Sequence, residues 1–514
     1  MALTREQTAF RQALTAASPR LTHRPMPVLS ALIYFGVIAL WLILFARAFW
    51  LDGVIAWSAG IVYILYDTAL MVLIAVQTWP MIAAGGNTET AANSGNSQSL
   101  ETSPSIGVII AAYNEAAVLP ATLAALRAQS IAPDRILIAD DGSTDGTGLI
   151  LTEQFGLHAP HIGELSAPGT IDPSIQWLRL PRSGKANALN AAVAKMDTDI
   201  VVIVDADTHL AIDGICHMRQ AFAGNARLVA AGGILIPVCD ETFIGCLFQM
   251  FQRYEYIRNN ISRFAWMRMQ SLLLISGAFA GFRRDALLAV GGFDPESFVE
   301  DYELTHRLHR YSIDHGLGWQ LATIGAAHAT TEAPSRFGTF LAQRRRWFAG
   351  FLQTQYWNRD MTGSRHYGKL GTTMLPIKAL DTVQPIYGLT AIVLLVILVS
   401  RGQFEIAAFV FSIVGAKLAV DFAFQIWTMH LYRRLTGDRA HFSTAGALLA
   451  AAIEPFSFQV LRHLGAAWGW LSFLTRTQRW GHQSRARFNL AIGDHPTIGS
   501  PLETRSQRGS TTRH

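Results

Sequence analysis

An apolar run that ends in two carboxylates lies near the middle of the chain and reads Ile200-Val201-Val202-Ile203-Val204-Asp205-Ala206-Asp207. Consecutive β-branched residues predict a strand buried on both faces. Residues i and i+2 of an extended backbone point the same way, so Asp205 and Asp207 project together from the strand end. Two hard oxygen ligands suit Mg²⁺ or Mn²⁺, which complete their shell with phosphate oxygens. The pattern predicts a metal and diphosphate site here, with an ordinary acidic turn as the alternative.

Similar apolar runs surround this strand and alternate with helical patterns. Strands are expected over residues 106–111, 135–139 and 228–236, and helices over residues 118–129, 185–196 and 213–222. This alternation predicts an α/β domain with a mostly parallel sheet covered by helices on both faces. Ligands of such sheets bind at the carboxyl ends of the strands, which is where the carboxylates fall.

Two further motifs follow predicted strands or open predicted helices. Asp140-Asp141-Gly142-Ser143 is either a capped turn or a carboxylate that accepts hydrogen bonds from a nucleotide base. Ser183-Gly184-Lys185 opens a helix, where backbone N–H groups and one lysine favour a phosphate; an ordinary helix start is the alternative.

Acidic and aromatic residues near residues 300 and 345 suggest the rest of a site. Glu300 and Asp301 precede an amphipathic helical pattern, where they either stabilise the helix start or supply a general base. Gln343, Arg346 and Trp347 share one helix face by their spacing. Gln and Arg donate hydrogen bonds and Trp offers a flat stacking surface, although a buried Trp with satisfied polar neighbours fits the same pattern.

The composition indicates contact with lipid. Half of the 514 residues are hydrophobic and 15% are charged, against about 25% in ordinary soluble proteins. Residues 28–50 would extend about 35 Å as a helix, enough to cross a hydrocarbon core of about 30 Å. Asp67, inside the second span, is expected to face another helix, because a lipid-facing carboxylate costs about 3 kcal/mol. Further spans are expected over residues 54–78, 383–400, 404–430 and, less regularly, 443–474.

The charge distribution suggests an orientation. Arginines concentrate in residues 1–27, 433–439 and 476–514. The first two groups predict that the N-terminus and the α/β domain lie in the cytoplasm. A single fifth span would place the arginine-rich C-terminus outside, so either residues 443–474 are partly re-entrant or this tail breaks the rule. No nucleic-acid motif accompanies the charge, and no nucleic-acid partner is expected.

The three cysteines form no C-x-x-C pair, so neither a disulfide framework nor a zinc site is expected, and we expect buried thiols in a reducing cytosol.

The predicted organisation has seven parts. They are a basic cytoplasmic tail, two transmembrane helices, a flexible linker, the α/β domain, interfacial helices, about three C-terminal membrane segments and a basic tail, over residues 1–27, 28–80, 81–104, 105–335, 336–382, 383–474 and 475–514. The helix over residues 336–357 is expected at the membrane interface, with a soluble-domain helix as the alternative. The whole predicts a multi-pass protein of the inner (cytoplasmic) membrane.

Six motifs occur in a fixed order along residues 105–350. They are Ala112-Tyr113-Asn114-Glu115, Asp140-Asp141-Gly142-Ser143, Gly184-Lys185-Ala186-Asn187-Ala188-Leu189-Asn190, the D-x-D at 205–207, Glu300-Asp301 and the Q-x-x-R-W at 343–347. Each is weak alone, but the ordered set resembles the processive family 2 glycosyltransferases, which include cellulose, chitin, hyaluronan and poly-N-acetylglucosamine synthases. Residues 276–279 and 281–284 look most like the poly-β-1,6-N-acetylglucosamine synthases.

The resemblance implies a GT-A fold and an inverting transfer from a UDP-sugar, either UDP-GlcNAc or UDP-glucose, that depends on Mg²⁺ or Mn²⁺. Asp301 would be the catalytic base, with Glu300 its nearest rival. The other implied roles are donor binding by Glu115, Asp140, Asp141, Lys185 and Asp205, metal binding by Asp205 and Asp207, and acceptor binding by Gln343, Arg346 and Trp347.

The implied function is extension of a β-linked polysaccharide that leaves through the membrane spans, with accessory membrane subunits as further partners. One alternative is an enzyme that adds a single sugar to a lipid acceptor, and another is a non-catalytic export component, which the intact carboxylates disfavour. Val299 departs from the family pattern, where Thr is common before Glu-Asp. The segment after the last span is too short for a cyclic-di-GMP-binding PilZ domain, which argues against a bacterial cellulose synthase.

Overall fold

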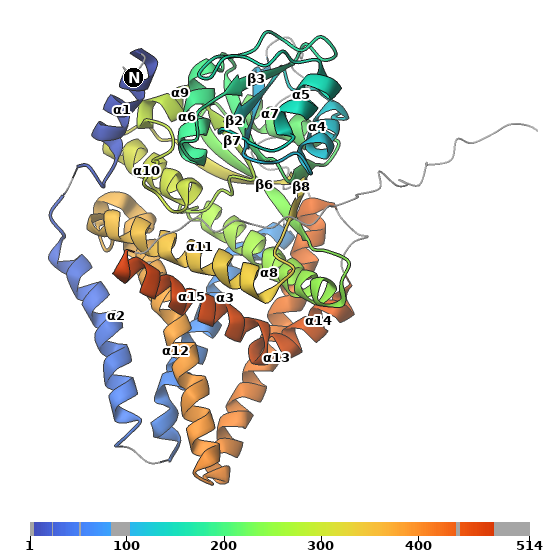
Figure 1. The fold of residues 1–514 in the computed structure, drawn as a ribbon. Coiled ribbons are helices and arrows are strands. Elements are labelled where there is room, and N and C mark those ends of the chain that lie inside the picture. Colours follow the sequence, from blue (N-terminus) through green and yellow to red (C-terminus); the bar gives the residue numbers. More distant parts are fainter. Residues whose placement is uncertain (1–4, 23, 51–52, 84–102, 438–442, 477–514) are drawn as a thin grey trace, which may run out of the picture.

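The computed structural model describes residues 5–22, 24–50, 53–83, 103–437 and 443–476. An α/β domain lies at one end of a bundle of long helices (Figure 1). Most of the predicted linker and of the basic C-terminal tail lies outside the described residues.

Eight strands form one mixed sheet in the order β3-β2-β1-β4-β7-β6-β8-β5. The strands are β1 (Ile106–Ala112), β2 (Arg135–Asp140), β3 (Ile175–Arg179), β4 (Ile200–Asp205), β5 (Thr208–Leu210), β6 (Leu228–Val238), β7 (Phe279–Arg283) and β8 (Gln320–Glu332). Strands β3, β2, β1 and β4 run parallel, β7 runs antiparallel between β4 and β6, and β8 is parallel to β6 and antiparallel to β5. The predicted α/β architecture of the GT-A kind is confirmed, and each of the four predicted strands is present.

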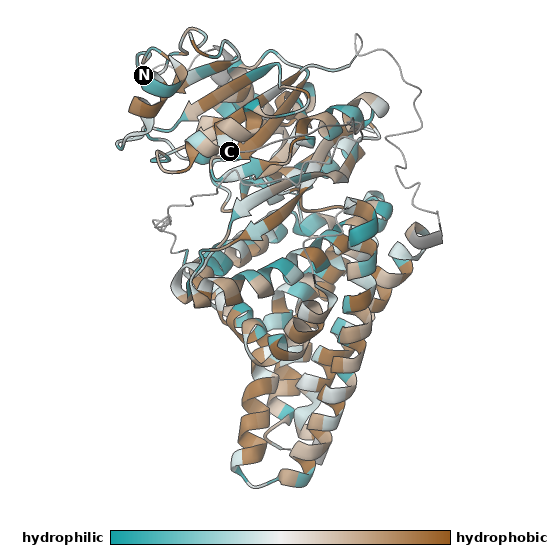
Figure 2. Cartoon of the chain, turned by 90° about the vertical axis from the view of Figure 1, so that its right-hand side faces the viewer, coloured by the Kyte–Doolittle hydropathy of each residue, from teal (hydrophilic) through white to brown (hydrophobic). Residues whose placement is uncertain are grey.

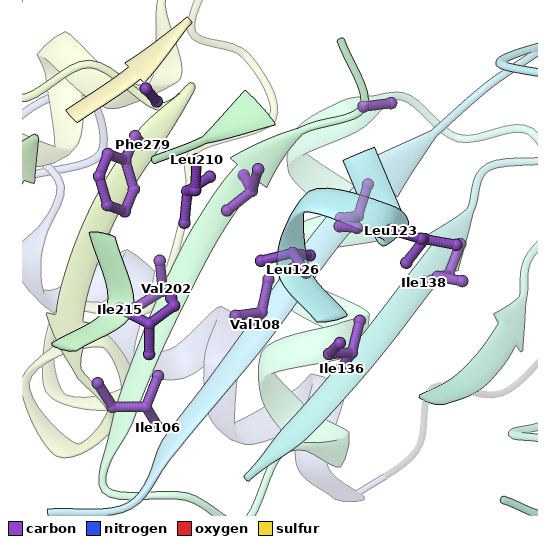
Figure 3. Packing of buried hydrophobic residues seen from close by; sticks show 14 of the residues in the cluster. Ile106, Val108, Leu123, Leu126, Ile136, Ile138, Val202, Leu210, Ile215 and Phe279 are labelled. Atoms are coloured by element: carbon purple, nitrogen blue, oxygen red, sulfur yellow. The ribbon is translucent and has the colours of Figure 1, made fainter. Parts of the chain in front are cut away.

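Both faces of the sheet are buried because successive side chains of each strand point to opposite layers. In β1, Val108 and Ile110 join one apolar cluster while Ile109 joins another. Figure 3 shows the first cluster, in which Leu123 and Leu126 of α4 (Leu119–Arg127) cover the strands. The other helices on the two faces are α5 (Thr147–Phe155), α6 (Lys185–Lys195), α7 (Gly214–Gly224), α9 (Arg284–Val290) and α10 (Glu300–Asp314).

Within the part of the chain that the structure describes, four helices are long and apolar enough to cross a membrane, and a bent pair of helices could form a fifth span. The four helices are α2 (Val28–Arg47), α3 (Ser58–Ala83), α12 (Leu375–Ser400) and α13 (Phe404–Thr436). Figure 2 shows that apolar residues predominate in the parts of the helices that lie away from the α/β domain. Asp67 of α3 faces another helix as expected, since Nζ of Lys417 on α13 lies 2.6 Å from its carboxylate.

A second group of helices lies crosswise between the α/β domain and the four long helices (Figure 1). These helices are α8 (Phe243–Arg268), α11 (Phe337–Trp357), α14 (Thr444–Ile453) and α15 (Phe458–Thr475). The segment with α14 and α15 bends by 50°, which fits either a broken span or a re-entrant loop. Helix α15 packs along α11. The sequence did not predict α8, because buried polar residues such as Glu255 and Asn260 interrupt its apolar period.

The N-terminal segment, predicted as a basic cytoplasmic tail, contains a helix that packs on the α/β domain. Residues 5–17 form helix α1 (Arg5–Ala17), whose Leu14 is buried against the α/β domain and would touch any side chain placed at Gly291. Arg20 then donates two hydrogen bonds, of 3.1 and 3.0 Å, to the buried carboxylate of Asp294. One face of this amphipathic helix therefore packs on the α/β domain, although the helix also carries arginines.

The cysteines follow the expectation only in part. All three thiols are free, but only Cys239 is buried, while Cys216 is half-buried and Cys246 is exposed. Cys246 lies near the start of α8, whose first turn faces outward.

Candidate active site

The predicted site residues meet at the carboxyl ends of three neighbouring parallel strands. Strand β1 lies between β2 and β4, so the segments that follow residues 112, 140 and 205 emerge side by side. Asp205 is the last residue of β4, and Asp207 lies in the turn before β5. The strand-end placement predicted for the D-x-D is therefore observed.

Asp140 shapes the turn at the end of β2. Its carboxylate accepts hydrogen bonds from the backbone N–H of Ser143 at 2.8 Å and from Nε1 of Trp177 at 3.2 Å. This is the capped-turn arrangement, and Asp140 is buried in it.

Asp141 holds the loop that leads into α6. Its carboxylate accepts hydrogen bonds from the backbone N–H groups of Ser183 and Gly184, at 2.7 and 2.9 Å, and forms an ion pair with Arg182. Two backbone N–H groups at this helix start thus donate their hydrogen bonds to a protein carboxylate. Gly142 permits the approach, because a Cβ there would lie 2.8 Å from the backbone nitrogen of Arg182 and its φ is +75°.

Arg182 is a candidate site residue that the sequence did not predict. Its guanidinium lies over the ring of Tyr113, with the guanidinium carbon Cζ 3.4 Å from the ring centroid. This contact joins the loop before α6 to the segment after β1. An arginine directly before a Ser-Gly-Lys helix start was the available signal.

The segment after β1 is held in an unusual backbone conformation. Asn114 has a φ of +58°, in the left-handed region. Its Oδ1 accepts a hydrogen bond of 2.8 Å from the backbone N–H of Thr144. The next residue, Glu115, is buried, and its backbone N–H donates to Oγ1 of Thr147 at 2.9 Å. Glu115 therefore lies beside the turn that Asp140 shapes.

Lys185 links the D-x-D to the acidic pair of α10. Its Nζ lies 2.6 Å from Oδ1 of Asp205 and 3.2 Å from Oε1 of Glu300. Burial by itself would lower the pKa of Lys185, but the charges of Asp205 and Glu300 outweigh it and raise the pKa above its ordinary value. Lys185 is therefore a fixed positive charge between the carboxylate of Asp205 at a strand end and that of Glu300 at a helix start.

Asp301 and Glu300 begin α10 and differ in ionisation. Burial, followed by the charge of Glu300, raises the pKa of Asp301 to about 6. Its two oxygens accept hydrogen bonds from the backbone N–H groups of Gly277, at 2.8 Å, and Tyr302, at 2.7 Å. Burial would also raise the pKa of Glu300, but the positive charges of Lys185 and Arg346 outweigh it and lower the pKa. Two adjacent carboxylates thus have pKa values that are pushed apart, which is typical of acid–base sites.

Helix α11 brings its three predicted residues to this region. The charge of Arg346 acts on Glu300, so the Q-x-x-R-W face approaches the acidic pair. Oε1 of Gln343 is buried and accepts no hydrogen bond within the described part of the chain. The ring of Trp347 is only half-buried and lies 4.6 Å from the guanidinium carbon of Arg344. These features leave Gln343 and Trp347 able to meet a ligand.

The D-x-D is the part of the site that fits a divalent cation. Within the described residues no group of three or more His, Cys, Asp or Glu side chains could hold a metal ion. Two carboxylates from one strand end, with Asp205 about a third exposed, match the small number of protein ligands that Mg²⁺ and Mn²⁺ use beside phosphate. The donor set therefore fits a metal that shares its shell with a diphosphate.

Two family models match the chain. The one described as Glycosyl transferase family 2 matches residues 107–291, and the one described as Glycosyl transferase family group 2 matches residues 200–414. The two matches overlap and together cover the sheet, the D-x-D, the acidic pair, α11 and the first part of the following helices.

Curated relatives match over the same region. An N-acetylglucosaminyltransferase of Mesorhizobium japonicum is 30% identical over 266 residues, which are 49% of this chain and 57% of the relative. A poly-beta-1,6-N-acetyl-D-glucosamine synthase of Staphylococcus epidermidis is 26% identical over 265 residues, 50% of this chain and 58% of the relative. The chain thus spans little more than half the length of these relatives.

Among solved structures, the mannosyltransferase PcManGT of Pyrobaculum calidifontis, in complex with GDP-Man and Mn²⁺, is similar with a TM-score of 0.46 and 21% identity over 76% of this chain and 99% of that one. The family matches carry the assignment instead, because they span the strand-end carboxylates, the acidic pair and the Q-x-x-R-W helix in the order in which the structure assembles them. By these matches, residues 107–414 of the chain are similar to the family 2 glycosyltransferases.

Proposed function

We propose that the chain transfers N-acetylglucosamine from UDP-GlcNAc to a growing β-linked polysaccharide with inversion at the sugar carbon. The cluster of Lys185, Asp205, Glu300 and Asp301 carries this proposal, because it places a metal-type carboxylate, a fixed positive charge and a carboxylate of raised pKa next to one another. The names of the relatives support N-acetylglucosamine over glucose.

The residues suggest a division of labour for the transfer. The Asp301 carboxylate takes the proton of the acceptor hydroxyl, the oxygen forms a bond to the anomeric carbon, and the bond from that carbon to the diphosphate breaks. The positive charge of Lys185 favours the departing diphosphate. Asp205 and Asp207 would hold the Mg²⁺ or Mn²⁺, which neutralises charge on the diphosphate when bound.

The donor end of the proposed site is the segment around Asp140, Asp141 and Glu115. Asp141 orders the loop of Arg182, and Arg182 covers Tyr113, so these residues form one wall at the ends of β1 and β2. The proposed acceptor end is the α11 face with Gln343, Arg346 and Trp347. The apolar helices below it are consistent with a multi-pass protein of the cytoplasmic membrane that passes its product across the bilayer.

A panel of labelled UDP-sugars tests the function directly. Membranes that contain the protein are incubated with each UDP-sugar, and the product is digested with linkage-specific glycosidases. We expect incorporation from UDP-GlcNAc into material that a β-N-acetylglucosaminidase degrades. A labelled product that partitions into lipid extracts, with no polymer, would instead favour a single transfer to a lipid acceptor.

The raised pKa of Asp301 predicts an acid limb in the pH profile. Only the ionised carboxylate can accept a proton, so kcat/KM should be constant near pH 8 and fall tenfold for each unit below about pH 6. An unperturbed aspartate would place this limb near pH 4. The profile is measured with UDP-GlcNAc at saturating metal, and the fraction of folded protein at each pH is checked by gel filtration in detergent. A rate that stays constant down to pH 5 would contradict the assignment.

Trp347 is expected to matter for the acceptor more than for the donor. Trp347→Ala should shorten the polymer severalfold and lower the elongation rate on the order of tenfold, because base or sugar stacking on an aromatic ring contributes about 1–3 kcal/mol. UDP-GlcNAc binding should change less than twofold. Product length is measured by gel electrophoresis, and Trp357→Ala on the same helix serves as the control. Wild-type length and rate in a folded Trp347→Ala variant would remove Trp347 from the site.

A further inference from the structure

A network of buried charges holds the helix that carries Gln343, Arg346 and Trp347. Both terminal guanidinium nitrogens of Arg344 donate to Glu255 of α8, Nη1 to Oε1 and Nη2 to Oε2, each at 2.7 Å. The two side chains are 6% and 5% exposed. Parallel hydrogen bonds between a guanidinium and a carboxylate fix direction as well as distance.

The network continues into the crosswise helices. Arg462 of α15 lies 3.4 Å from Glu255 and 3.0 Å from Glu454. Glu454, in the turn between α14 and α15, also pairs with Arg258 of α8. Three arginines and two glutamates therefore tie α8, α11 and the bent α14–α15 segment into one unit.

Arg344 also supports the ring of Trp347. Its guanidinium carbon lies 4.6 Å from the centroid of Trp347 and 4.7 Å from that of Phe340. The same group that Glu255 holds thus lies against the aromatic surface proposed for the acceptor. The orientation of Arg344 and the position of the Trp347 ring are coupled.

Close backbone packing makes the rotation of α11 sensitive to this pair. A Cβ at Gly465 of α15 would lie 2.6 Å from the Cβ of Arg344, and one at Gly469 would lie 2.7 Å from the Cβ of Phe348. Helix α11 therefore lies on α15 with glycines at the contact, and the Arg344–Glu255 pair sets which face turns toward Glu300.

We propose that Glu255 is a positioning residue for the acceptor side of the site, which acts through Arg344 on Trp347 and on the α11 face. This inference rests on the acceptor role given to α11 in the proposed function. Glu255 lies on a different helix from every residue that the family motifs name.

The test compares acceptor-dependent and acceptor-independent reactions. Glu255→Gln keeps the shape of the side chain but removes its charge and one of the two acceptor oxygens. We expect polymer elongation to fall at least about tenfold and polymer length to drop. UDP-GlcNAc binding, and the slow hydrolysis of UDP-GlcNAc in which water replaces the sugar acceptor, should change less than threefold. Arg344→Lys keeps the charge but loses the paired hydrogen bonds. It should also lower elongation without lowering UDP-GlcNAc binding or UDP release, and its loss of elongation should be smaller than that of Glu255→Gln.

The matched control is Asp360→Asn. Asp360 accepts two hydrogen bonds, of 2.9 and 2.8 Å, from Arg310, a pair with similar geometry and burial that does not touch α11's Q-x-x-R-W face. Loss of this pair should lower thermal stability and, if it lowers activity, should lower UDP release and elongation together.

The outcomes separate clearly. Elongation that falls alone in Glu255→Gln or Arg344→Lys supports the positioning role. Equal loss of UDP release and elongation in both variants, as in the control, or no loss in either, would overturn it. Wild-type protein that makes no product from any UDP-sugar would overturn the proposed function instead, and that result is seen before any variant is made.

Discussion

Asp301→Asn is expected to lower turnover at least about a hundredfold while UDP-GlcNAc binding is retained. General base catalysis typically contributes 10²–10⁴-fold, and the amide of Asn cannot accept the proton of a sugar hydroxyl. The substitution removes a carboxylate whose ionisation burial opposes, but it also replaces one of the two oxygens that accept backbone hydrogen bonds. Folding of the variant is therefore checked by thermal unfolding. Turnover is measured as UDP release and donor binding by calorimetry.

Two further variants make this result specific. Asp314→Asn, at the other end of α10 and paired with Arg24, controls for general disturbance of the helix and should retain turnover. Glu300→Gln tests the neighbouring carboxylate. Near-normal turnover of Asp301→Asn with an inactive Glu300→Gln would move the base by one residue. If both variants remain active, the acidic pair serves only to stabilise the start of α10.

Asp205→Ala and Asp207→Ala are each expected to abolish metal-dependent turnover. The cation is held by few protein ligands, and loss of one should remove several kcal/mol of charge stabilisation, on the order of a thousandfold in rate. Binding of UDP should also lose its dependence on Mg²⁺ or Mn²⁺, which calorimetry with and without metal measures separately from activity.

The two aspartates should differ in one respect. Asp205 also pairs with Lys185. Its loss leaves Lys185 paired with Glu300 alone, so the pH profile of the remaining activity should change as well, whereas Asp207→Ala should not change it. Asp213→Asn, an exposed aspartate that starts α7 without capping it, is the control. Normal metal dependence in either alanine variant would remove the D-x-D from the site.

Regular features of the fold could be predicted from the sequence because each has a local signature. Buried parallel strands are unbroken apolar runs, so β1, β2, β4 and β6 were placed within two residues of their observed ends. The long apolar helices are equally plain, because a lipid-facing helix needs apolar residues on every side. The position of the carboxylates at strand ends followed from chain order alone.

Some elements could not be predicted from the sequence because their residues are stabilised by partners far away in the chain. Strand β7 is short and runs antiparallel between β4 and β6, and a five-residue strand gives little periodicity to detect. Helix α8 buries charges that are paired with Arg344, Arg462 and Glu454 on other elements. Helix α1 is amphipathic, and its contact with the α/β domain is visible only in the tertiary structure.

The sequence by itself determined which residues are candidates for the chemistry. The D-x-D, the acidic pair and the Q-x-x-R-W face are recognised by residue type and spacing, since a carboxylate or an aromatic ring has its chemical character wherever it lies. Only the tertiary structure decided how they are arranged. It showed that Asp141 holds the loop before α6 and that Lys185 joins Asp205 to Glu300. It also showed that the charges of Lys185 and Arg346 lower the pKa of Glu300, while burial raises that of Asp301. Ionisation and pairing depend on distance and on exclusion of water, and those are set by segments that lie apart in the chain, such as the segments that hold Lys185 and Glu300.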